Sequence, residues 1–405
     1  MSFKSLREWK IWPWCCLALV LAALSAMAAQ PARPIDAGRQ NALALEQQGK
    51  IAEAEAAWRA MSQAHPRNPE PYAHLGLLEA RQERYAEAIP LYRKALALDP
   101  RVSALRLNLG LALFKHGDLK AAIAEFAMLR KGLPDGSADA NRVDLLTGMA
   151  HYGLAQYSEA VPTLKAASRR EPQNQTLLLT LAHSCLWSRQ FDCVMDTYKQ
   201  ILALNAESAE ADMLAGEALD EMKDNEGATK MFRAAVKANP KEPNVHFGLG
   251  YLLWTQKQYS EAATEFAAEL QNDAKHAQAL LYLGDSYLQL NRPEEAQPRL
   301  EQAVRLDVSL WLGLLDLGVI DADAGRNEQA LARMRKAAEL KPDDVNVHWR
   351  LGRLLRTMGH KQEAAVELEK ANKLNKAADD DLYKKISNGA RRPPEAAAPA
   401  GEAAH

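Results

Sequence analysis

Side chains that could bind a metal ion lie close together near the middle of the chain. They are His183, Cys185 and Cys193. Their spacing matches none of the usual zinc-binding patterns and no fourth ligand is evident, so we predict that no metal binds here. Two interpretations remain for the cysteines. They form a Cys185–Cys193 disulfide, or they stay unbonded and fill apolar space.

The sequence contains none of the short motifs that build common active sites. The patterns HExxH, GxSxG and GxxxxGK[ST] are all missing from it. We therefore predict that the protein is not an enzyme and uses no cofactor. Its formal net charge is −2, which lacks the basic excess that phosphate backbones attract, so we also predict no nucleic-acid partner.

Small residues recur along the chain, in most places every 34 positions. This column contains Ala42, Gly76, Gly110, Gly148, Ala182, Gly216, Gly250, Gly284, Gly318 and Gly352. Twelve positions after each of them stands a second, mostly alanine column. Sixteen positions after each stands a large apolar residue, and the column reads Trp58, Tyr92, Phe126, Leu164, Tyr198, Phe232, Phe266, Leu300, Met334 and Leu368.

Each column suits a pair of antiparallel helices. Two small residues let the helices cross closely, and the large residue fills the space beside the crossing. Prolines such as Pro100 and Pro134 follow eight positions after the large residue, where they end the second helix. One helix pair cannot bury its apolar side alone, so we expect ten pairs to stack into a continuous core.

One unit carries these features together, at Tyr72, Leu75, Gly76, Tyr85, Ala88, Tyr92, Ala95 and Pro100. This pattern resembles the tetratricopeptide repeat signature, whose period is also 34 residues. The resemblance implies an all-α fold, a right-handed superhelical solenoid of about ten tandem helix-turn-helix repeats. The repeats are predicted at 35–68, 69–102, 103–136, 141–174, 175–208, 209–242, 243–276, 277–310, 311–344 and 345–378, with residues 137–140 as an insertion that lengthens a loop.

In tetratricopeptide proteins the first helix of each pair lines a concave groove. The resemblance therefore places partner-binding residues three before, one after and four after the glycine column. The predicted groove residues are Phe114, Tyr152, Glu217, Asp220, Phe247, Tyr251, Trp254, Leu281, Leu288, Trp349, Arg353 and Arg356.

The aromatic residues Phe247, Tyr251 and Trp254 recur at helical spacing, so they lie on one helix face and form the predicted main anchor. The alternative is that they pack between neighbouring repeats as core. The arginines are either part of the groove or a solvated surface. Glu217 and Asp220 predict a protein or peptide partner that is amphipathic with a basic side.

Two functions are compatible with this pattern. The first is a protein–protein interaction scaffold of the cell envelope that binds a partner segment in the groove. The alternative is an accessory subunit of an envelope machine, in polysaccharide export or pilus assembly, that docks through its convex face and its ends.

The N-terminal segment has the pattern of a secretory signal peptide. Lys4, Arg7 and Lys10 precede an uncharged stretch, and Ala26-Met27-Ala28 offers small residues for cleavage. We predict a signal peptide over 1–28, export to the periplasm or beyond, and no stable membrane insertion after cleavage. The alternative is an uncleaved N-terminal anchor that leaves the repeats outside the cytoplasm.

The C-terminal segment changes composition after the repeats. Residues 379–389 predict a short capping helix, because acidic residues begin the segment and Gly389 ends it. Residues 390–405 are rich in proline and alanine and predict a disordered tail.

Overall fold

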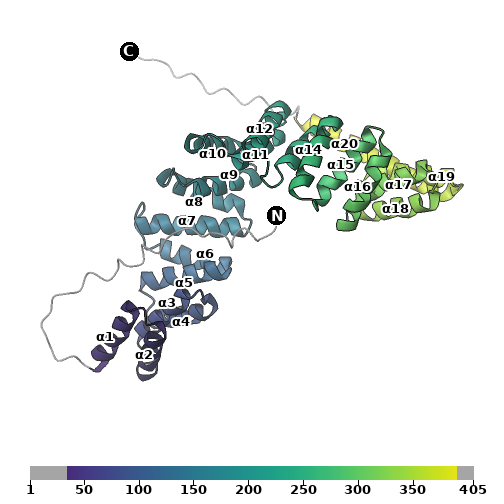
Figure 1. Ribbon diagram of the computed structural model, residues 1–405. Coiled ribbons are helices and arrows are strands. Elements are labelled where there is room, and N and C mark those ends of the chain that lie inside the picture. Colours follow the sequence, from purple (N-terminus) through teal and green to yellow (C-terminus); the bar gives the residue numbers. More distant parts are fainter. Residues whose placement is uncertain (1–33, 390–405) are drawn as a thin grey trace, which may run out of the picture. The chain divides into compact units, whose positions relative to one another are not determined.

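Helices are the only regular elements in the part of the chain that the structure describes, residues 34–389 (Figure 1). The computed structural model has twenty of them, arranged as consecutive helix pairs, and this confirms the all-α repeat solenoid. No helix in this range is both long enough and apolar enough to cross a membrane. The predicted signal peptide, 1–28, and the predicted tail, 390–405, lie outside the described residues.

The chain divides into two compact units, with the boundary between Leu154 and Ala155. Unit 1 contains α1 (Pro34–Gln47), α2 (Ile51–Ala64), α3 (Pro69–Arg81), α4 (Tyr85–Leu98), α5 (Ser103–His116), α6 (Leu119–Arg130) and α7 (Ala138–Gly153). Each of α2 to α7 packs against the helix that precedes it.

Unit 2 continues the same succession of helices. It contains α8 (Tyr157–Arg170), α9 (Gln175–Trp187), α10 (Phe191–Leu204), α11 (Ala209–Glu221), α12 (Asn225–Ala238), α13 (Val245–Thr255), α14 (Tyr259–Asn272), α15 (Ala277–Gln289), α16 (Pro293–Leu306), α17 (Trp311–Asp323), α18 (Asn327–Leu340), α19 (Val345–Thr357) and α20 (Lys361–Gly389). Odd-numbered helices are the first of each pair, and even-numbered helices are the second.

The glycine column allows the two helices of a pair to touch. A Cβ atom built on Gly110 would lie 2.5 Å from the buried ring of Phe126, and one built on Gly250 would lie 2.9 Å from Phe266. Real Cβ atoms do not approach other carbons so closely, so any larger residue would push the helices apart. This confirms the physical reason expected for the two columns.

The turn inside each pair has one residue with positive φ, always seven positions after the glycine column. These residues are Gly49, Glu83, Gly117, Ala155, Arg189, Lys223, Lys257, Asn291, Gly325 and Gly359. A left-handed residue is a common way to end a helix and reverse the chain, and glycine adopts it without steric cost. The residue types in this column vary, so the sequence alone did not reveal it.

First helices of successive pairs also contact one another in unit 2. The contacts run from α9 to α11, α13, α15, α17 and α19 in turn. Their side chains therefore meet across repeats as well as within them. This arrangement brings the predicted groove residues of neighbouring repeats together.

The structure refines one expectation about loops and corrects one about the C-terminal end. The insertion at 137–140 lies where the loop between α6 and α7 is long, spanning 131–137 against 99–102 at the preceding junction, and it also lengthens α7, since Ser137 caps the helix through its hydroxyl and Ala138 begins it. The segment 379–389 is not a separate capping helix, because α20 runs unbroken from Lys361 to Gly389. No glycine or proline interrupts α20 before Gly389, so nothing forces a break.

Candidate functional site

An aromatic cluster lies where α13 meets α15. Phe247, Tyr251 and Trp254 form a ladder on α13, with ring centroids 6.2 and 6.0 Å apart. Tyr282 of α15 packs edge-on against Tyr251 at 5.2 Å and against Trp254 at 4.9 Å. Edge-on pairs suit the charge distribution of aromatic rings, so the four side chains hold one another in place.

The start of α13 is fixed by a carboxylate from its partner helix. Buried Glu269 of α14 accepts the backbone N–H groups of Asn244 and Phe247, each at 3.1 Å. Such a carboxylate satisfies N–H groups that the helix leaves unpaired and opposes its positive end. These hydrogen bonds hold the backbone of Phe247 in place and so position its ring in the cluster.

The cluster is partly core and partly surface. Phe247 and Trp254 are half-buried, whereas Tyr251 keeps 40% of its surface exposed. Packing between repeats therefore describes Phe247 and Trp254 better, whereas an exposed anchor describes Tyr251 better. Tyr251 is the ring that a partner could cover directly.

A buried carboxylate joins the cluster to the next repeat. The indole N–H of Trp254 donates to Asp285 of α15 at 2.5 Å, and the amide of Gln289 donates to its other oxygen at 3.2 Å. Burial raises the pKa of Asp285, while these two hydrogen bonds and the charge of Arg350 oppose the rise. Trp254 is therefore tied to α15 through a polar bond as well as through ring contacts.

A second buried carboxylate, Asp316 of α17, lies close to the first. The residue is 8% exposed, and its Oδ2 atom has no hydrogen-bond partner among the described residues. Burial raises its pKa well above the usual range, the nearby Asp285 raises it further, and Arg350 of α19 lowers it. We call the seven residues linked in this way the first-helix face: Phe247, Tyr251, Trp254, Tyr282, Asp285, Asp316 and Arg350.

The predicted basic residues lie on α19 beside this face. Arg353 stacks its guanidinium 4.7 Å above the ring of Trp349, which is 43% exposed. Arg356 is exposed on the same helix. A guanidinium on an indole is a favourable cation–π contact, so Trp349 and Arg353 form a small exposed unit of their own.

The predicted acidic residues lie one repeat before the aromatic cluster. Glu217 and Asp220 are half-buried on α11, which contacts α13. Burial raises the pKa of Glu217, and the neighbouring His183 partly offsets that effect. His183 in turn pairs with Glu210 at 3.0 Å.

Four predicted groove residues lie apart from this face. Leu281 is 4% exposed and packs in the core of α15, α16 and α17, so it cannot contact a partner. Leu288 packs against the same core. Phe114 and Tyr152 are half-buried on α5 and α7 of unit 1, and Phe114 packs against the core of that unit.

Cys185 of α9 and Cys193 of α10 form a disulfide in the structure, with their Cα atoms 5.8 Å apart. The bond connects the two helices of one pair across their turn, and both residues are buried. The described residues contain no group of three or more potential metal ligands.

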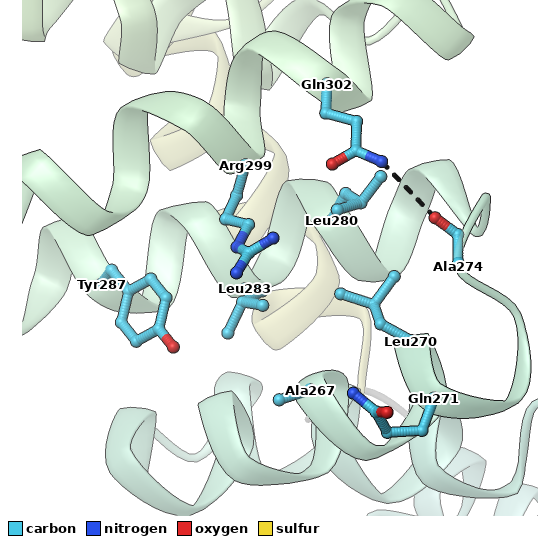
Figure 2. Close-up of a pocket in the computed structure, with 9 residues that line it drawn as sticks. All are labelled: Ala267, Leu270, Gln271, Ala274, Leu280, Leu283, Tyr287, Arg299 and Gln302. Atoms are coloured by element: carbon cyan, nitrogen blue, oxygen red, sulfur yellow. Dashed lines mark hydrogen bonds between the residues drawn. The ribbon is translucent and has the colours of Figure 1, made fainter.

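A pocket in unit 2 lies away from the first-helix face. Figure 2 shows it between α14, α15 and α16, with Leu270, Leu280 and Leu283 as its apolar wall and Arg299 at its edge. The Gln302 amide closes one side by donating to the carbonyl of Ala274 at 3.5 Å. No predicted site residue lines it.

Sequence reasoning missed Tyr282 and Asp316. Both stand two positions before the glycine column, which was not among the predicted groove columns. The column is mixed, with Asn108, Thr180 and Arg350 among its members, so the available signal was the place of Asp316 between Leu315 and Leu317. An acidic residue inside an otherwise apolar helix segment deserved notice, because buried charges are rare without a partner.

A family model described as a tetratricopeptide repeat matches residues 39–102, 74–137, 213–279, 281–320 and 315–378. These stretches cover more than half of the chain and include every residue of the first-helix face.

Curated relatives are similar at low identity. The DnaJ homolog subfamily C member 7 homolog of Schizosaccharomyces pombe is 24% identical over 310 residues, which cover 68% of this chain and 64% of the relative. The BBSome complex member BBS4 of Bos taurus is 24% identical over 201 residues, covering 50% and 38%. The chain thus spans less than two thirds of the length of these relatives.

Two solved structures are similar to the chain at low identity. One is described as YrrB, a TPR protein with an unusual peptide-binding site, with 20% identity and a TM-score of 0.38, covering 47% of this chain and 97% of that one. Another is the APC/C hetero-tetramer Cut9–Hcn1, with 15% identity and a TM-score of 0.42, covering 88% and 91%.

Proposed function

Since the chain belongs to the tetratricopeptide repeat family, we propose that it is a scaffold that holds a segment of a partner protein against the first-helix face of unit 2. Proteins of this family generally act as protein–protein interaction scaffolds, and the fold is typically non-catalytic. The observation that carries the proposal is Tyr251, an exposed ring on a rigid aromatic base. Anchors of this kind supply much of the energy of protein interfaces.

The aromatic base makes Tyr251 a good anchor for a physical reason. Its ring is already positioned by Phe247, Trp254 and Tyr282, so binding would immobilise little that is free beforehand. Preordered side chains lose less conformational entropy on binding than flexible ones. The family is supported by the match, whereas this surface as the binding site is our proposal.

We further propose that the scaffold works in the cell envelope. The support is the signal-peptide pattern of residues 1–28, which lie outside the described part of the chain. The Cys185–Cys193 disulfide agrees with an oxidising compartment, where such bonds persist.

Site-specific photo-crosslinking in the native cell tests the binding surface. A photoreactive phenylalanine analogue at Tyr251 should give adducts with a partner polypeptide, because this position would be covered in the complex. The same analogue at Lys230, exposed on second helix α12, is the matched control and should give none. Mass spectrometry of the adducts identifies the partner.

Purified partner then permits a quantitative measurement. We expect Tyr251→Ala to weaken binding by about thirtyfold, which corresponds to about 2 kcal/mol for an interface anchor. Trp187→Ala removes an exposed aromatic of α9 outside the first-helix face and should leave the affinity unchanged. Crosslinks from Lys230 alone, or equal affinity of the Tyr251→Ala variant and the native protein, would contradict the proposal.

A further inference from the structure

The pocket of unit 2 between α14, α15 and α16 has room for a large side chain of another molecule. Its volume is about 220 Å³ (Figure 2). A cavity of about 150 Å³ in a protein core already holds a benzene ring. Of the residues that line the pocket, Gln271, Ala274 and Arg299 are exposed. The pocket therefore opens to solvent, and a ligand can enter it.

The charge of the pocket comes from Arg299. This residue alone is charged among the nine that line the pocket, and it reaches from α16 toward Leu283 of α15 (Figure 2). Leu270, Leu280 and Leu283 form the apolar wall. The pocket thus offers an apolar surface beside a single positive charge.

Arg299 stands fifteen positions after the glycine column, where charged residues of other repeats have partners. In those repeats the charged side chain pairs with a side chain of its own repeat, with the paired atoms 2.5 to 2.8 Å apart. The partner stands either four positions before the glycine column or three positions after it. The pairs are Arg106–Glu125, His246–Glu265, His348–Glu367 and Asp321–Arg333.

Arg299 is the exception to this pairing. The two positions that supply partners in other repeats are occupied here by Leu280 and Tyr287, which both line the pocket. Glu295, one turn earlier on α16, pairs with Arg292 instead, at 2.6 Å. Arg299 therefore has no acidic partner among the described residues. The chain has replaced an internal ion pair by an apolar pocket with a free guanidinium group.

We propose that this pocket binds a segment of a partner protein in which a large apolar residue stands beside an aspartate or glutamate. The apolar side chain fills the space along the leucines, and the carboxylate pairs with Arg299, whose planar guanidinium group matches a carboxylate. Leu280 and Leu283 lie on the opposite side of α15 from Tyr282 and Asp285, because half a helical turn separates the two sets. The inference therefore does not rest on the first-helix face, and it gives the scaffold a second, separate binding surface.

Three short labelled peptides with a glycine–serine background test the pocket. They contain leucine beside glutamate, leucine beside glutamine, or alanine beside glutamate. Fluorescence anisotropy should show the leucine–glutamate peptide binding the purified protein about threefold to tenfold more tightly than either of the others. The charge preference is modest because Arg299 is exposed, and added salt should reduce it.

Arg299→Gln should abolish the preference for glutamate over glutamine. The matched control is Arg305→Gln, which removes an exposed arginine of α16 outside the pocket and should keep the preference. Far-UV circular dichroism verifies that both variants are folded. The pocket would be overturned as a docking site if the leucine–glutamate peptide bound no more tightly than either control peptide, or if its preference survived Arg299→Gln. Crosslinking at Tyr251 tests a different surface, so these results leave the first-helix face undecided.

Discussion

At the scale of single residues, Trp254 and Asp285 depend on each other. The indole N–H satisfies a carboxylate that is 3% exposed, and the carboxylate fixes the ring of Trp254 against Tyr282. Removing Trp254 would leave Asp285 with one donor fewer in a buried position, which costs stability as well as binding. Tyr251 makes no such bond to Asp285, but its ring packs against Phe247, Trp254 and Tyr282, so a thermal melt must accompany the binding measurement of the Tyr251→Ala variant.

The titration of Asp316 predicts a pH-dependent stability. Burial raises its pKa in the folded protein above the usual 3.8. The folded state therefore keeps the proton to higher pH than the unfolded state, and the native protein loses stability as pH rises through the folded pKa. We expect Asp316→Asn, which does not titrate, to raise stability at pH 7 by about 1 kcal/mol or more.

Thermal melts followed by circular dichroism at several pH values measure this effect. The gain from Asp316→Asn should shrink as the pH falls toward 3.8, the ordinary pKa of an aspartate, below which the group is protonated in both states. Asp323→Asn, at an exposed position, should melt like the native protein at every pH. A lower Tm of the Asp316→Asn variant at pH 7 would mean that the carboxylate has a stabilising partner.

At the scale of helix pairs, stability depends on how closely the two helices cross. The glycine column meets the large apolar column inside the pairs, as with Gly284 and Leu300 or Gly318 and Met334. A helix would gain stability from alanine in place of glycine if it stood alone. In the pair, the partner side chain occupies the space that a methyl group needs.

Gly110→Ala tests this conclusion in unit 1. The new Cβ atom would meet the ring of Phe126, which is fully buried and has nowhere to move. We expect a net loss of about 1–3 kcal/mol, measured as a lower Tm, because overpacking outweighs the gain in helix propensity.

Gly38→Ala in α1 is the matched control. A Cβ atom there would lie 3.8 Å from Met61, an ordinary contact, so the melting temperature should stay the same or rise. If Gly110→Ala were as stable as Gly38→Ala, close crossing would not be the reason for the glycine column.

At the scale of the whole molecule, the two units carry different parts of the predicted groove. Unit 2 contains the first-helix face together with Trp349, Arg353, Arg356, Glu217 and Asp220, whereas Phe114 and Tyr152 belong to unit 1. The binding proposal therefore rests on unit 2 alone. The predicted signal peptide concerns the whole chain, because export would decide which partner proteins the scaffold can meet.

N-terminal sequencing of the protein from its native cell tests whether the predicted signal peptide is cleaved. We expect the mature chain to begin at Ala29, because Ala26-Met27-Ala28 has the small residues that a signal peptidase accepts. Recovery of Met1 in the membrane fraction would instead support the uncleaved anchor. Recovery of Met1 in the soluble cytoplasmic fraction would contradict export altogether.

The sequence by itself determined the order of helices and the contacts within each pair. Both follow from a period of 34 residues and from the sizes of the residues in two columns, which are local properties of the chain. The contact between Gly250 and Phe266, for example, follows from their spacing along the chain and from the difference in their size.

Only the tertiary structure decided what happens between pairs. Whether Leu281 is core, whether Tyr282 joins the aromatic cluster and whether Asp316 loses its water depend on how one first helix packs on the next. That packing depends on the angle and distance between repeats, which a repeat length does not specify. Burial and electrostatic environment are therefore properties of the stack, and the candidate site emerges only when the repeats are packed together.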